Sequence, residues 1–461
     1  MVKKRSYTQA IAISIFFMLI SLAIFSIKLD YDKKNNLRFS PEIEDDLDKI
    51  VQFNNNQENP MISSLSNEPS VILEYPGKHD ITNRIIYVDN SATGNNDGSS
   101  WENAYPTLYA ALEDLSDEAD TTIKIAEGNG VYYEEYPNSY TYHIGSDDSG
   151  ILNHPNIIES KEGDNPVFYP VNINGFLLQG EYIIIRGLTF TGSNGNGNAF
   201  NIQDSNNIVF ENNTISNPQS NGLTLGWTSE TTIRNNQIFQ SLSGIYLFAS
   251  HNNIIEKNKV YKNGCVGVVL SGSESAGYST NNIIKNNLVF ENGYPGEGCY
   301  YEGELGGAGI RIEIGSDNNV IESNTVDSNK KGFYQGQEVN GRGILILQSM
   351  NNLLKNNIVT NNELTGIYLY DGVGTQLIYS DVWNNPSNYY NISPGIGSIS
   401  ADPKYIERLI NYHVRIGSLT IDKGDPSSPY QNEPRPNGNR INMGSYGNTK
   451  EATISSTKQI D

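Results

Sequence analysis

A short motif recurs seven times between Ile208 and Trp383, and this repetition limits what the 461-residue chain can fold into. In each copy two or three apolar residues precede a polar pair, and one or two more follow it, as in Ile283–Val289. When the copies are aligned, one column holds Gly187, Asn213, Asn236, Asn258, Asn287, Asn324, Asn357 and Asp381. The shortest step in this column is 22 residues. Self-similarity on this scale is typical of a solenoid built from stacked coils.

A second column with the same rhythm consists of glycines: Gly222, Gly244, Gly267, Gly309, Gly343 and Gly366. Each glycine opens a stretch of alternating residues, as in Gly244–Phe248. Period-2 alternation after a turn residue predicts strands and argues against helical repeats. We therefore predict an all-β fold, a single-stranded right-handed parallel β-helix. In it the asparagine column would stack from coil to coil and satisfy its amides by hydrogen bonds.

The net charge of −21 argues against a nucleic-acid partner, because phosphates would be repelled in the absence of a basic patch. An acidic surface of this kind can bind Ca²⁺. His143, His154 and His251 lack Cys, Asp or His partners at the spacing of metal ligands, and two cysteines alone make a weak metal site, so we assign none. We leave the cofactor unassigned, with Ca²⁺ as the one candidate.

The amino terminus carries an export signal, since the basic stretch Met1–Arg5 precedes an apolar run from Ala10 to Ile27. We favour an uncleaved signal-anchor within residues 1–30 over a cleaved signal peptide, because no clean cleavage site follows. Residues 31–80 are polar and rich in asparagine, which suggests a disordered spacer. We expect an extracellular or cell-surface protein, anchored in the membrane by this hydrophobic segment.

Both ends of the repeat region resemble the caps of extracellular pectate-lyase-like β-helix proteins. The opening cap is carried by Ile86–Asp89, Gly94–Tyr105 and Leu108–Leu112, and the closing segment by Ala401–Tyr405, Tyr412–Val414, Ile421–Tyr430 and Asn432–Gly447. The resemblance covers roughly residues 84 to 450. It implies a polysaccharide lyase, a uronan epimerase, a glycoside hydrolase or a noncatalytic surface protein.

The repeats and caps divide the chain as follows: an N-terminal cap and first coils at 81–180, a central β-helix at 181–385, a C-terminal cap at 386–450 and a tail at 451–461. An amphipathic helix near Pro106–Leu115 is expected to plug the first end of the core. The catalytic signatures of the best-known relatives are missing. For example, Asp402-Pro403 continues as Lys404, not as the histidine of alginate epimerases. The resemblance therefore transfers no catalytic residue.

Candidate site residues come from the outward positions of the strands after the glycine column. One outward column reads Thr224, Tyr246, Val269, Arg311, Leu345 and Tyr368, and the next reads Gly226, Phe248, Ser271, Glu313, Leu347 and Tyr370. Three insertions sit on the same coils, namely Gly272–Thr280, Tyr294–Ala308 and Lys330–Gly341. Long loops on a rigid scaffold are where function concentrates. We expect them to form a groove over Arg311.

The candidate catalytic residues in this groove are Arg311, Glu313, Glu302, Glu304, Tyr300, Tyr301 and Lys331. The candidate saccharide-binding residues are the aromatic side chains Tyr246, Phe248, Tyr368, Tyr370 and Tyr334, because aromatic faces stack on sugar rings. For a lyase acting on a polyuronate, Arg311 would neutralise the substrate carboxylate, a tyrosine or Lys331 would remove the C5 proton, and the glutamates could hold Ca²⁺.

Two other functions fit the same residues. A glycoside hydrolase needs two carboxyl groups roughly 5 to 9.5 Å apart, and a pair among Glu302, Glu304 and Glu313 could supply them. Alternatively the chain is a noncatalytic envelope rod that binds glycan, and Arg311 with Glu313 is only a solvated surface ion pair. In each case we expect a monomer whose partner is a polysaccharide or glycan.

The chain has two cysteines, Cys265 and Cys299, and both lie in the exported part. Cys265 follows Asn263-Gly264, and the equivalent pair one coil later, Asn292-Gly293, directly precedes the insertion that carries Cys299. A disulfide between them would pin that insertion to the coil below.

Overall fold

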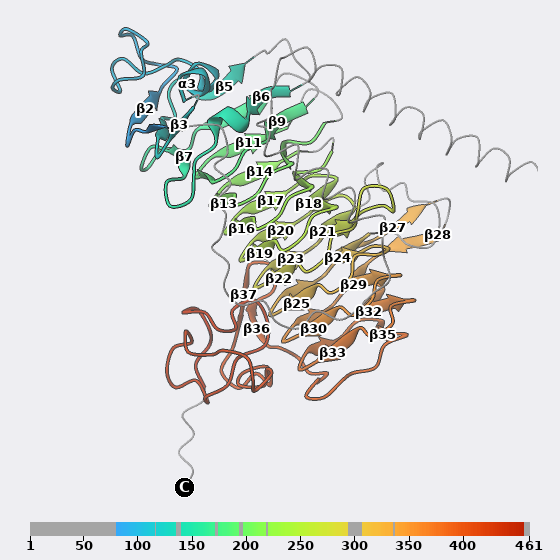
Figure 1. The fold of residues 1–461 in the computed structure, drawn as a ribbon. Coiled ribbons are helices and arrows are strands. Elements are labelled where there is room, and N and C mark those ends of the chain that lie inside the picture. Colours follow the sequence, from blue (N-terminus) through green and yellow to red (C-terminus); the bar gives the residue numbers. More distant parts are fainter. Residues whose placement is uncertain are drawn as a thin grey trace, which may run out of the picture. The chain divides into compact units, whose positions relative to one another are not determined.

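A computed structural model describes residues 80–115, 117–134, 140–170, 174–192, 197–217, 220–293, 307–334 and 337–455. These residues form a right-handed parallel β-helix, in which three parallel sheets wind around one core (Figure 1). The predicted fold is confirmed. The predicted signal-anchor and spacer fall on residues 1–79, which lie outside the described residues. Within the described ranges, no helix has the length and apolar character needed to cross a membrane.

Each complete coil contributes one strand to each sheet, and β2 adds one more strand to the first of them. Sheet I, with 11 strands, consists of β2 (Ile85–Val88), β4 (Thr122–Ile125), β7 (Asn156–Ser160), β10 (Ile183–Arg186), β13 (Val209–Glu211), β16 (Thr232–Arg234), β19 (Ile254–Glu256), β22 (Ile283–Lys285), β25 (Val320–Glu322), β30 (Leu353–Lys355) and β33 (Gln376–Ile378). Sheet II, with 10 strands, consists of β5 (Val131–Glu134), β8 (Val167–Pro170), β11 (Thr189–Thr191), β14 (Thr214–Ser216), β17 (Gln237–Phe239), β20 (Lys259–Tyr261), β23 (Leu288–Phe290), β26 (Thr325–Asp327), β31 (Ile358–Thr360) and β34 (Asp381–Trp383).

Sheet III also has 10 strands and carries the longest of them. They are β6 (Tyr140–Ile144), β9 (Asn174–Leu178), β12 (Phe200–Gln203), β15 (Leu223–Gly226), β18 (Ser243–Phe248), β21 (Val266–Ser271), β24 (Ala308–Ile312), β29 (Arg342–Leu347), β32 (Thr365–Tyr370) and β35 (Ser387–Tyr390). Three strand pairs lie outside these sheets: β1 (Asp80–Ile81) with β3 (Glu118–Ala119), β27 (Lys331–Tyr334) with β28 (Gln337–Asn340), and β36 (Tyr405–Glu407) with β37 (Asn411–Val414).

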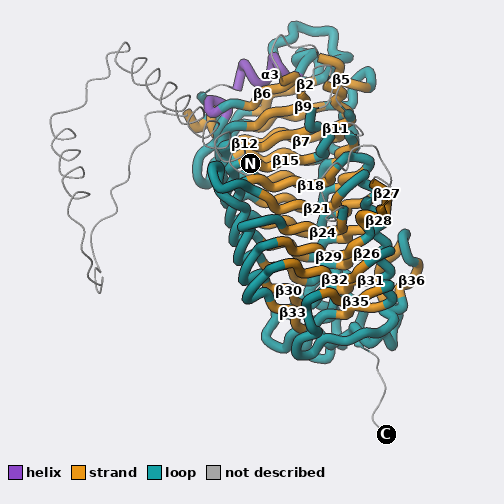
Figure 2. Tube along the Cα trace, turned by 90° about the vertical axis from the view of Figure 1, so that its right-hand side faces the viewer, coloured by secondary structure: helices purple, strands orange, loops and turns teal. Residues whose placement is uncertain are grey.

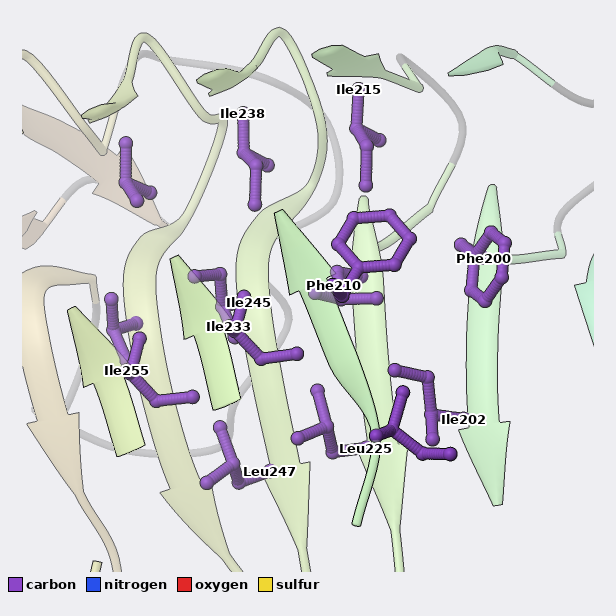
Figure 3. Packing of buried hydrophobic residues seen from close by; sticks show 14 of the residues in the cluster. Phe200, Ile202, Phe210, Ile215, Leu225, Ile233, Ile238, Ile245, Leu247 and Ile255 are labelled. Carbon is purple, nitrogen blue, oxygen red and sulfur yellow. The ribbon is translucent and has the colours of Figure 1, made fainter. Parts of the chain in front are cut away.

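The core is filled by the inward residue of each short strand and two inward residues of each sheet III strand. Ile233, Ile238, Ile245 and Leu247 supply these positions in one coil, and all are fully buried (Figure 3). In the first coils the same positions hold aromatic rings, which stack from coil to coil: Tyr132, Tyr142, Phe168, Phe176, Phe190, Phe200 and Phe210. Burial of this continuous core is the main force that holds the coils together.

The predicted asparagine ladder is confirmed at the turn between sheets I and II. The first residue of each polar pair takes a left-handed conformation, with φ of 56° at Asn235 and 55° at Asn286, which turns the chain. The second residue enters the ladder. Asn258 Nδ2, for example, donates to Asn287 Oδ1 at 3.0 Å and to the Ile233 carbonyl at 2.9 Å. The polar pair of the sequence motif therefore encodes a turn residue followed by one asparagine of the ladder, which we call a rung.

Both ends of the predicted ladder column are wrong by one residue. Gly187 occupies the left-handed position, with φ 74°, and the backbone N of Leu188 donates a hydrogen bond to Asn213 Oδ1. At the other end, the hydroxyl of Ser380 accepts a hydrogen bond from the backbone N of Asn357. Asp381 is the next residue and pairs with Ile358 across the sheet. Spacing along the sequence fails here because neither terminal copy has an asparagine at the ladder position: Leu188 and Ser380 stand there.

Two further ladders stabilise the other two turns. The turn between sheets III and I holds Asn253, Asn282, Asn319 and Asn352, and the turn between sheets II and III holds Asn263, Asn292, Asn329, Asn362 and Asn385. In both ladders each side chain donates to the carbonyl oxygen of the next amide. All three corners of the solenoid are thus closed by buried amide stacks.

The outer face of sheet I carries a row of charges that alternates in sign from strand to strand. In order the row is Lys124, Glu159, Arg186, Glu211, Arg234, Glu256, Lys285, Glu322 and Lys355. Glu211 is the most enclosed of the paired acids, and its carboxylate lies 2.6 Å from Arg234 and 3.7 Å from Arg186. Opposite charges directly across a strand pair are stabilising, and like charges are destabilising.

The Glu211→Lys variant is expected to lose about 1 to 3 kcal/mol of unfolding free energy, because three cations would then be adjacent on sheet I. Urea unfolding at low and high salt measures this loss, which should shrink at high salt as the repulsion is screened. Glu230→Lys makes the same change in net charge at an exposed residue outside the row and should be close to neutral. Equal losses in both variants would contradict the role of the row.

The predicted N-terminal helix is confirmed as α3 (Leu108–Leu115), which lies at one end of the stack of coils (Figure 2). It begins after Thr107, whose hydroxyl accepts a hydrogen bond of 3.2 Å from the backbone N of Ala110, as an N-cap residue does. Leu108, Ala111, Leu112 and Leu115 are buried and join the core of the solenoid. The helix therefore covers the first end of the apolar core.

The C-terminal segment, residues 391–455, crosses the last coil and then packs along the side of sheet II. Near its start, Ile399 pairs with Asp381 of the last coil. Farther on, the ring of Tyr412 lies 5.1 Å from that of Phe290 and continues an aromatic stack formed by Phe239, Tyr261 and Phe290. The segment therefore covers the flank of several central coils in addition to the last one.

Buried Asp327 at the end of β26 anchors this segment. Its two carboxylate oxygens accept hydrogen bonds from Tyr412 Oη at 2.9 Å, Ser328 Oγ at 2.6 Å, Thr360 Oγ1 at 2.7 Å and Asn361 Nδ2 at 2.7 Å. Burial, with the Asp327 carboxylate close by, holds the pKa of Tyr412 far above its ordinary value, so the phenol remains a proton donor.

Candidate functional site

The outer face of sheet III presents the predicted columns in the predicted register. One row runs across eight strands, and we call it the outer row: Asn201, Thr224, Tyr246, Val269, Arg311, Leu345, Tyr368 and Tyr390. The second predicted column is formed by the pairs Gly226 with Phe248, Phe248 with Ser271, and Leu347 with Tyr370. Glu313 directly follows β24, and its backbone N donates to the Leu270 carbonyl at 2.8 Å.

At the middle of the outer row a guanidinium and a carboxylate form an ion pair. Arg311 Nη2 contacts Glu313 Oε1, and Ser271 Oγ donates to Glu313 Oε2. Arg311 is only 2% exposed. A charge this far from water is stabilised only when an opposite charge and hydrogen bonds compensate for its desolvation, and Glu313 supplies both. The expectation of a solvated surface pair is wrong.

The neighbours of Arg311 in the row are apolar and buried. Val269 is 1% exposed and Leu345 is fully buried, although both side chains point away from the solenoid core. Val269 packs with Cys265 and Val266, and Leu345 packs with Ala308, Leu347 and Tyr368 in two small clusters separate from the main core. The central part of this face is therefore covered, and Arg311 does not line an open groove.

Aromatic side chains flank the buried centre on both sides. On one side Tyr246 and Phe248 are partly exposed, and the ring of Trp227 meets that of Phe248 edge-on at 5.5 Å. On the other side Tyr368 and Tyr390 stack at 4.3 Å with nearly parallel rings. The buried guanidinium of Arg342 lies 4.7 Å from the Tyr368 ring centre, and Tyr370 is 48% exposed.

The first insertion, Gly272–Thr280, folds against the same aromatic residues. Trp227 Nε1 donates to the Ala276 carbonyl at 3.2 Å. The ring of Tyr278 packs so closely on Gly315 that a Cβ there would come within 2.8 Å of it, and the φ of 74° at Gly315 also favours glycine. This loop is thus held along one edge of the outer row.

The third insertion contains the antiparallel pair β27 and β28, whose base is tied to the following coil. Lys331 donates its backbone N to Glu363 Oε2 at 3.0 Å, and Lys330 Nζ lies 3.1 Å from Glu363 Oε1. The predicted binding residue Tyr334 lies on β27 opposite Gln337. Nothing places Lys331 beside Arg311, so its role as a base stays a prediction.

Several predicted site residues lie outside the described part of the chain: Tyr300, Tyr301, Glu302, Glu304 and Cys299. Cys265 is disulfide-bonded and nearly buried, but its predicted pairing with Cys299 stays a prediction for the same reason. Within the described ranges no three His, Cys, Asp or Glu side chains come together as a metal site would require. The Ca²⁺ assignment is therefore untested.

Three side chains at this face were not among the candidate residues: Trp227, Arg342 and Tyr390. Tyr390 extends the outer row by one strand, but its coil lacks the column glycine that marks the others. Arg342 precedes Gly343, and the same position in other coils holds small or apolar residues such as Ser243 and Val266. A charged residue at a position that is otherwise small or apolar is the sequence signal that could have identified Arg342 as a site residue.

Two cavities lie elsewhere, between the solenoid and the C-terminal segment. One, of about 510 Å³, is at the corner between sheets I and II and is lined by lysine and asparagine side chains. The other, of about 530 Å³, lies between Trp383 and Asn384 of the last coil and Lys404, Arg408 and Arg415 of the C-terminal segment.

Comparisons with known proteins agree with this architecture. Residues 174–340 match the family described as the right handed beta helix region. The structure is similar to that of pectate lyase Pel9A, with a TM-score of 0.55 and 16% identity over 78% of this chain and 96% of that chain. It is also similar to the lacto-N-biosidase from Eubacterium ramulus, with a TM-score of 0.50 and 11% identity over 68% of each chain. No curated protein matches the sequence significantly. These likenesses establish a right-handed parallel β-helix.

Proposed function

We propose that this chain acts on a polysaccharide that lies along the outer face of sheet III, and that its reaction is β-elimination in a polyuronate. The observation that carries the proposal is the Arg311–Glu313 ion pair, which lies in the outer row between Tyr246 on one side and Tyr368 on the other. Tyr246 and Tyr368 are four strands apart, so these two aromatic residues are separated by about 19 Å. A short run of sugar rings spans that distance.

The residues supply the parts that the reaction needs. Removal of the C5 proton from a uronate requires the adjacent carboxylate to be neutralised, and Arg311 carries a fixed positive charge for this. Glu313, held by Ser271, orients the guanidinium. Tyr300, Tyr301 and Lys331 are the candidate bases, and Glu302 and Glu304 would hold Ca²⁺ if the reaction uses it. The aromatic rings would stack on the sugars before and after the cleaved bond.

The similarity to pectate lyase Pel9A supports a lyase by analogy, because the fold accommodates polyuronate cleavage in that protein. The lacto-N-biosidase has the same fold and another chemistry, so a glycoside hydrolase that uses Glu313 with a second carboxylate is the alternative enzyme. The basic and apolar amino terminus supports export and a cell-surface location.

One observation favours a noncatalytic function. Arg311 is 2% exposed and its neighbours Val269 and Leu345 are buried, so a substrate could reach the guanidinium only if the cover moved. A glycan-binding rod needs no such movement, because Tyr370, Tyr390 and Trp227 are each close to half exposed. This function is the second candidate.

The test is an assay of the full-length chain on a panel of polyuronates and neutral glycans, with and without Ca²⁺. It records the ultraviolet absorbance of unsaturated products and the release of reducing ends. If the chain is a lyase, Arg311→Ala should lower the rate by about 100-fold to 1,000-fold, as loss of a charge-stabilising group does. Arg311→Lys keeps the charge and should lose less. Arg234→Ala removes an arginine from sheet I and serves as the matched control.

Each result decides between the candidates. Unsaturated products that form equally fast in Arg311→Ala would refute the assigned site. Reducing ends without unsaturation would indicate hydrolysis. Silence in both assays, with glycan binding that Tyr368→Ala and Tyr370→Ala weaken, would establish the noncatalytic rod. Circular dichroism of each variant separates loss of function from loss of fold.

A further inference from the structure

The cavity at the corner between sheets I and II lies on the opposite side of the solenoid from sheet III. Its solenoid wall comes from three consecutive coils, where Asn235, Lys257 and Asn286 occupy the left-handed turn positions. Because these residues precede the ladder asparagines, their side chains point away from the core. Its other wall is the loop of residues 432–451 in the C-terminal segment. The volume of about 510 Å³ falls within the range of small-ligand sites.

The cavity is positively charged in a chain whose net charge is −21. Lys257, Lys259 and Lys450 line it, and none of the three forms an ion pair with a described residue. The only acidic residue in the lining is Glu451, whose carboxylate is 68% exposed and lies 3.4 Å from His413 Nε2. Three lysines around one cavity attract an anion more strongly than an isolated surface lysine does.

The walls are held in place before any ligand arrives. Asn286 Nδ2 donates to the carbonyl oxygens of Ser445 at 3.0 Å and Gly447 at 2.8 Å, which fixes the loop to the solenoid. The ammonium of Lys259 lies 5.0 Å from the ring centre of Tyr261 and 5.6 Å from that of Phe290. Preorganisation of this kind lowers the entropy that a ligand must overcome on binding.

The remaining lining groups suit a polyhydroxylated molecule. The side-chain amides of Asn235 and Asn432 make no hydrogen bond with a described residue, so both can bind hydroxyl groups. The ring of Tyr446 stacks on His413 at 3.8 Å. Burial raises the pKa of Tyr446 to about 12, so its hydroxyl stays protonated at neutral pH. An inorganic anion would use the lysines alone, whereas a saccharide would also engage these amides.

We propose that this cavity binds a carboxylate-bearing sugar unit of an acidic saccharide, at a site separate from the outer face of sheet III. The lysines would neutralise the carboxylate, and the asparagine amides would bind the hydroxyl groups. The site would hold an acidic polysaccharide against the solenoid whether or not sheet III binds or cleaves it. It therefore shares a ligand class with the proposed function but does not depend on it.

Amine footprinting of the full-length chain tests this proposal at the site itself. Lysines are acetylated under limiting conditions, and mass spectrometry follows Lys257 and Lys450 in the presence of trigalacturonate, galactotriose or sodium sulfate. Trigalacturonate should slow the acetylation of both lysines severalfold, and galactotriose should not. Lys262, whose side chain is 54% exposed and lies outside the cavity lining, serves as the internal control.

Variants then measure affinity by calorimetry. The double change Lys257→Gln with Lys450→Gln should weaken trigalacturonate binding by about tenfold or more, whereas Lys262→Gln should leave it unchanged. In Tyr368→Ala, which alters sheet III alone, the protection of Lys257 and Lys450 should persist. Absence of protection by trigalacturonate would overturn the proposal, and equal protection by sulfate would reduce the site to a simple anion site and overturn its saccharide specificity. If the lyase assay shows no activity, the expected protection of Lys257 and Lys450 and the expected loss of affinity in the double variant stay the same.

Discussion

Replacing Asp327 by alanine is expected to detach the C-terminal segment from sheet II and to lower the free energy of unfolding by about 3 to 5 kcal/mol. The carboxylate accepts four hydrogen bonds in a fully buried position, one of them from Tyr412 of the C-terminal segment. Alanine would leave the buried hydroxyl donors of Thr360 and Tyr412 without this acceptor. Urea unfolding measures the loss, and limited proteolysis should cut residues 404–455 faster in the variant.

The control is Tyr412→Phe, which removes one of the four bonds and keeps the ring on Phe290. It should cost about 1 to 2 kcal/mol and leave the segment docked. If Asp327→Ala unfolded at the wild-type midpoint with the wild-type cleavage pattern, Asp327 would not be the anchor of the segment.

Asn287→Ala should destabilise the solenoid by about 3 to 4 kcal/mol, because it interrupts the first ladder in the middle of the stack. The Asn287 amide donates to the Ile255 carbonyl at 2.8 Å and to Asn324 Oδ1 at 3.0 Å. Its own oxygen accepts the backbone N of Asn258 at 2.9 Å and Asn258 Nδ2 at 3.0 Å. Thermal and urea unfolding measure the effect.

Asn252→Gly is the matched change at an exposed asparagine. Asn252 takes a left-handed turn conformation, with φ 57°, which glycine adopts without strain, and its side chain belongs to no ladder. This variant should stay within about 0.5 kcal/mol of the wild type. A similar loss at both positions would show that the turn, and not the ladder, carries the stability.

The solenoid could be predicted from sequence because each coil repeats the same local rule. The polar pair specifies a turn and a rung, the alternation after the glycine specifies a strand, and both are readable within one period. The other two ladders are harder to recognise from the sequence because serine or threonine replaces asparagine at some of their first positions. Ser241 and Thr231 hold those positions, and the amide column begins only at Asn263 and Asn253. When the residue type at a ladder position changes from coil to coil, the sequence shows no recurring residue by which the repeats can be aligned.

The candidate site was predictable in register but not in burial. Alternation places Arg311 between Val269 and Leu345 on the outer face of sheet III, and that arrangement is confirmed. Whether such a face meets water depends on what packs over it, which is a long-range property that no local pattern encodes. The same holds for the docking of the C-terminal segment, where Asn286 bonds to Gly447, 161 residues away. Contacts of this range also form the cavity at the corner between sheets I and II.

The alternating charges of sheet I limit how this solenoid can change its length. If the coil that carries Glu256 were deleted, Arg234 would face Lys285, and a duplicated coil would likewise place two charges of one sign side by side. Deleting or duplicating two consecutive coils restores the alternation. On this face, lengthening or shortening the solenoid without a clash of like charges therefore takes a pair of coils, although the structural repeat is a single one.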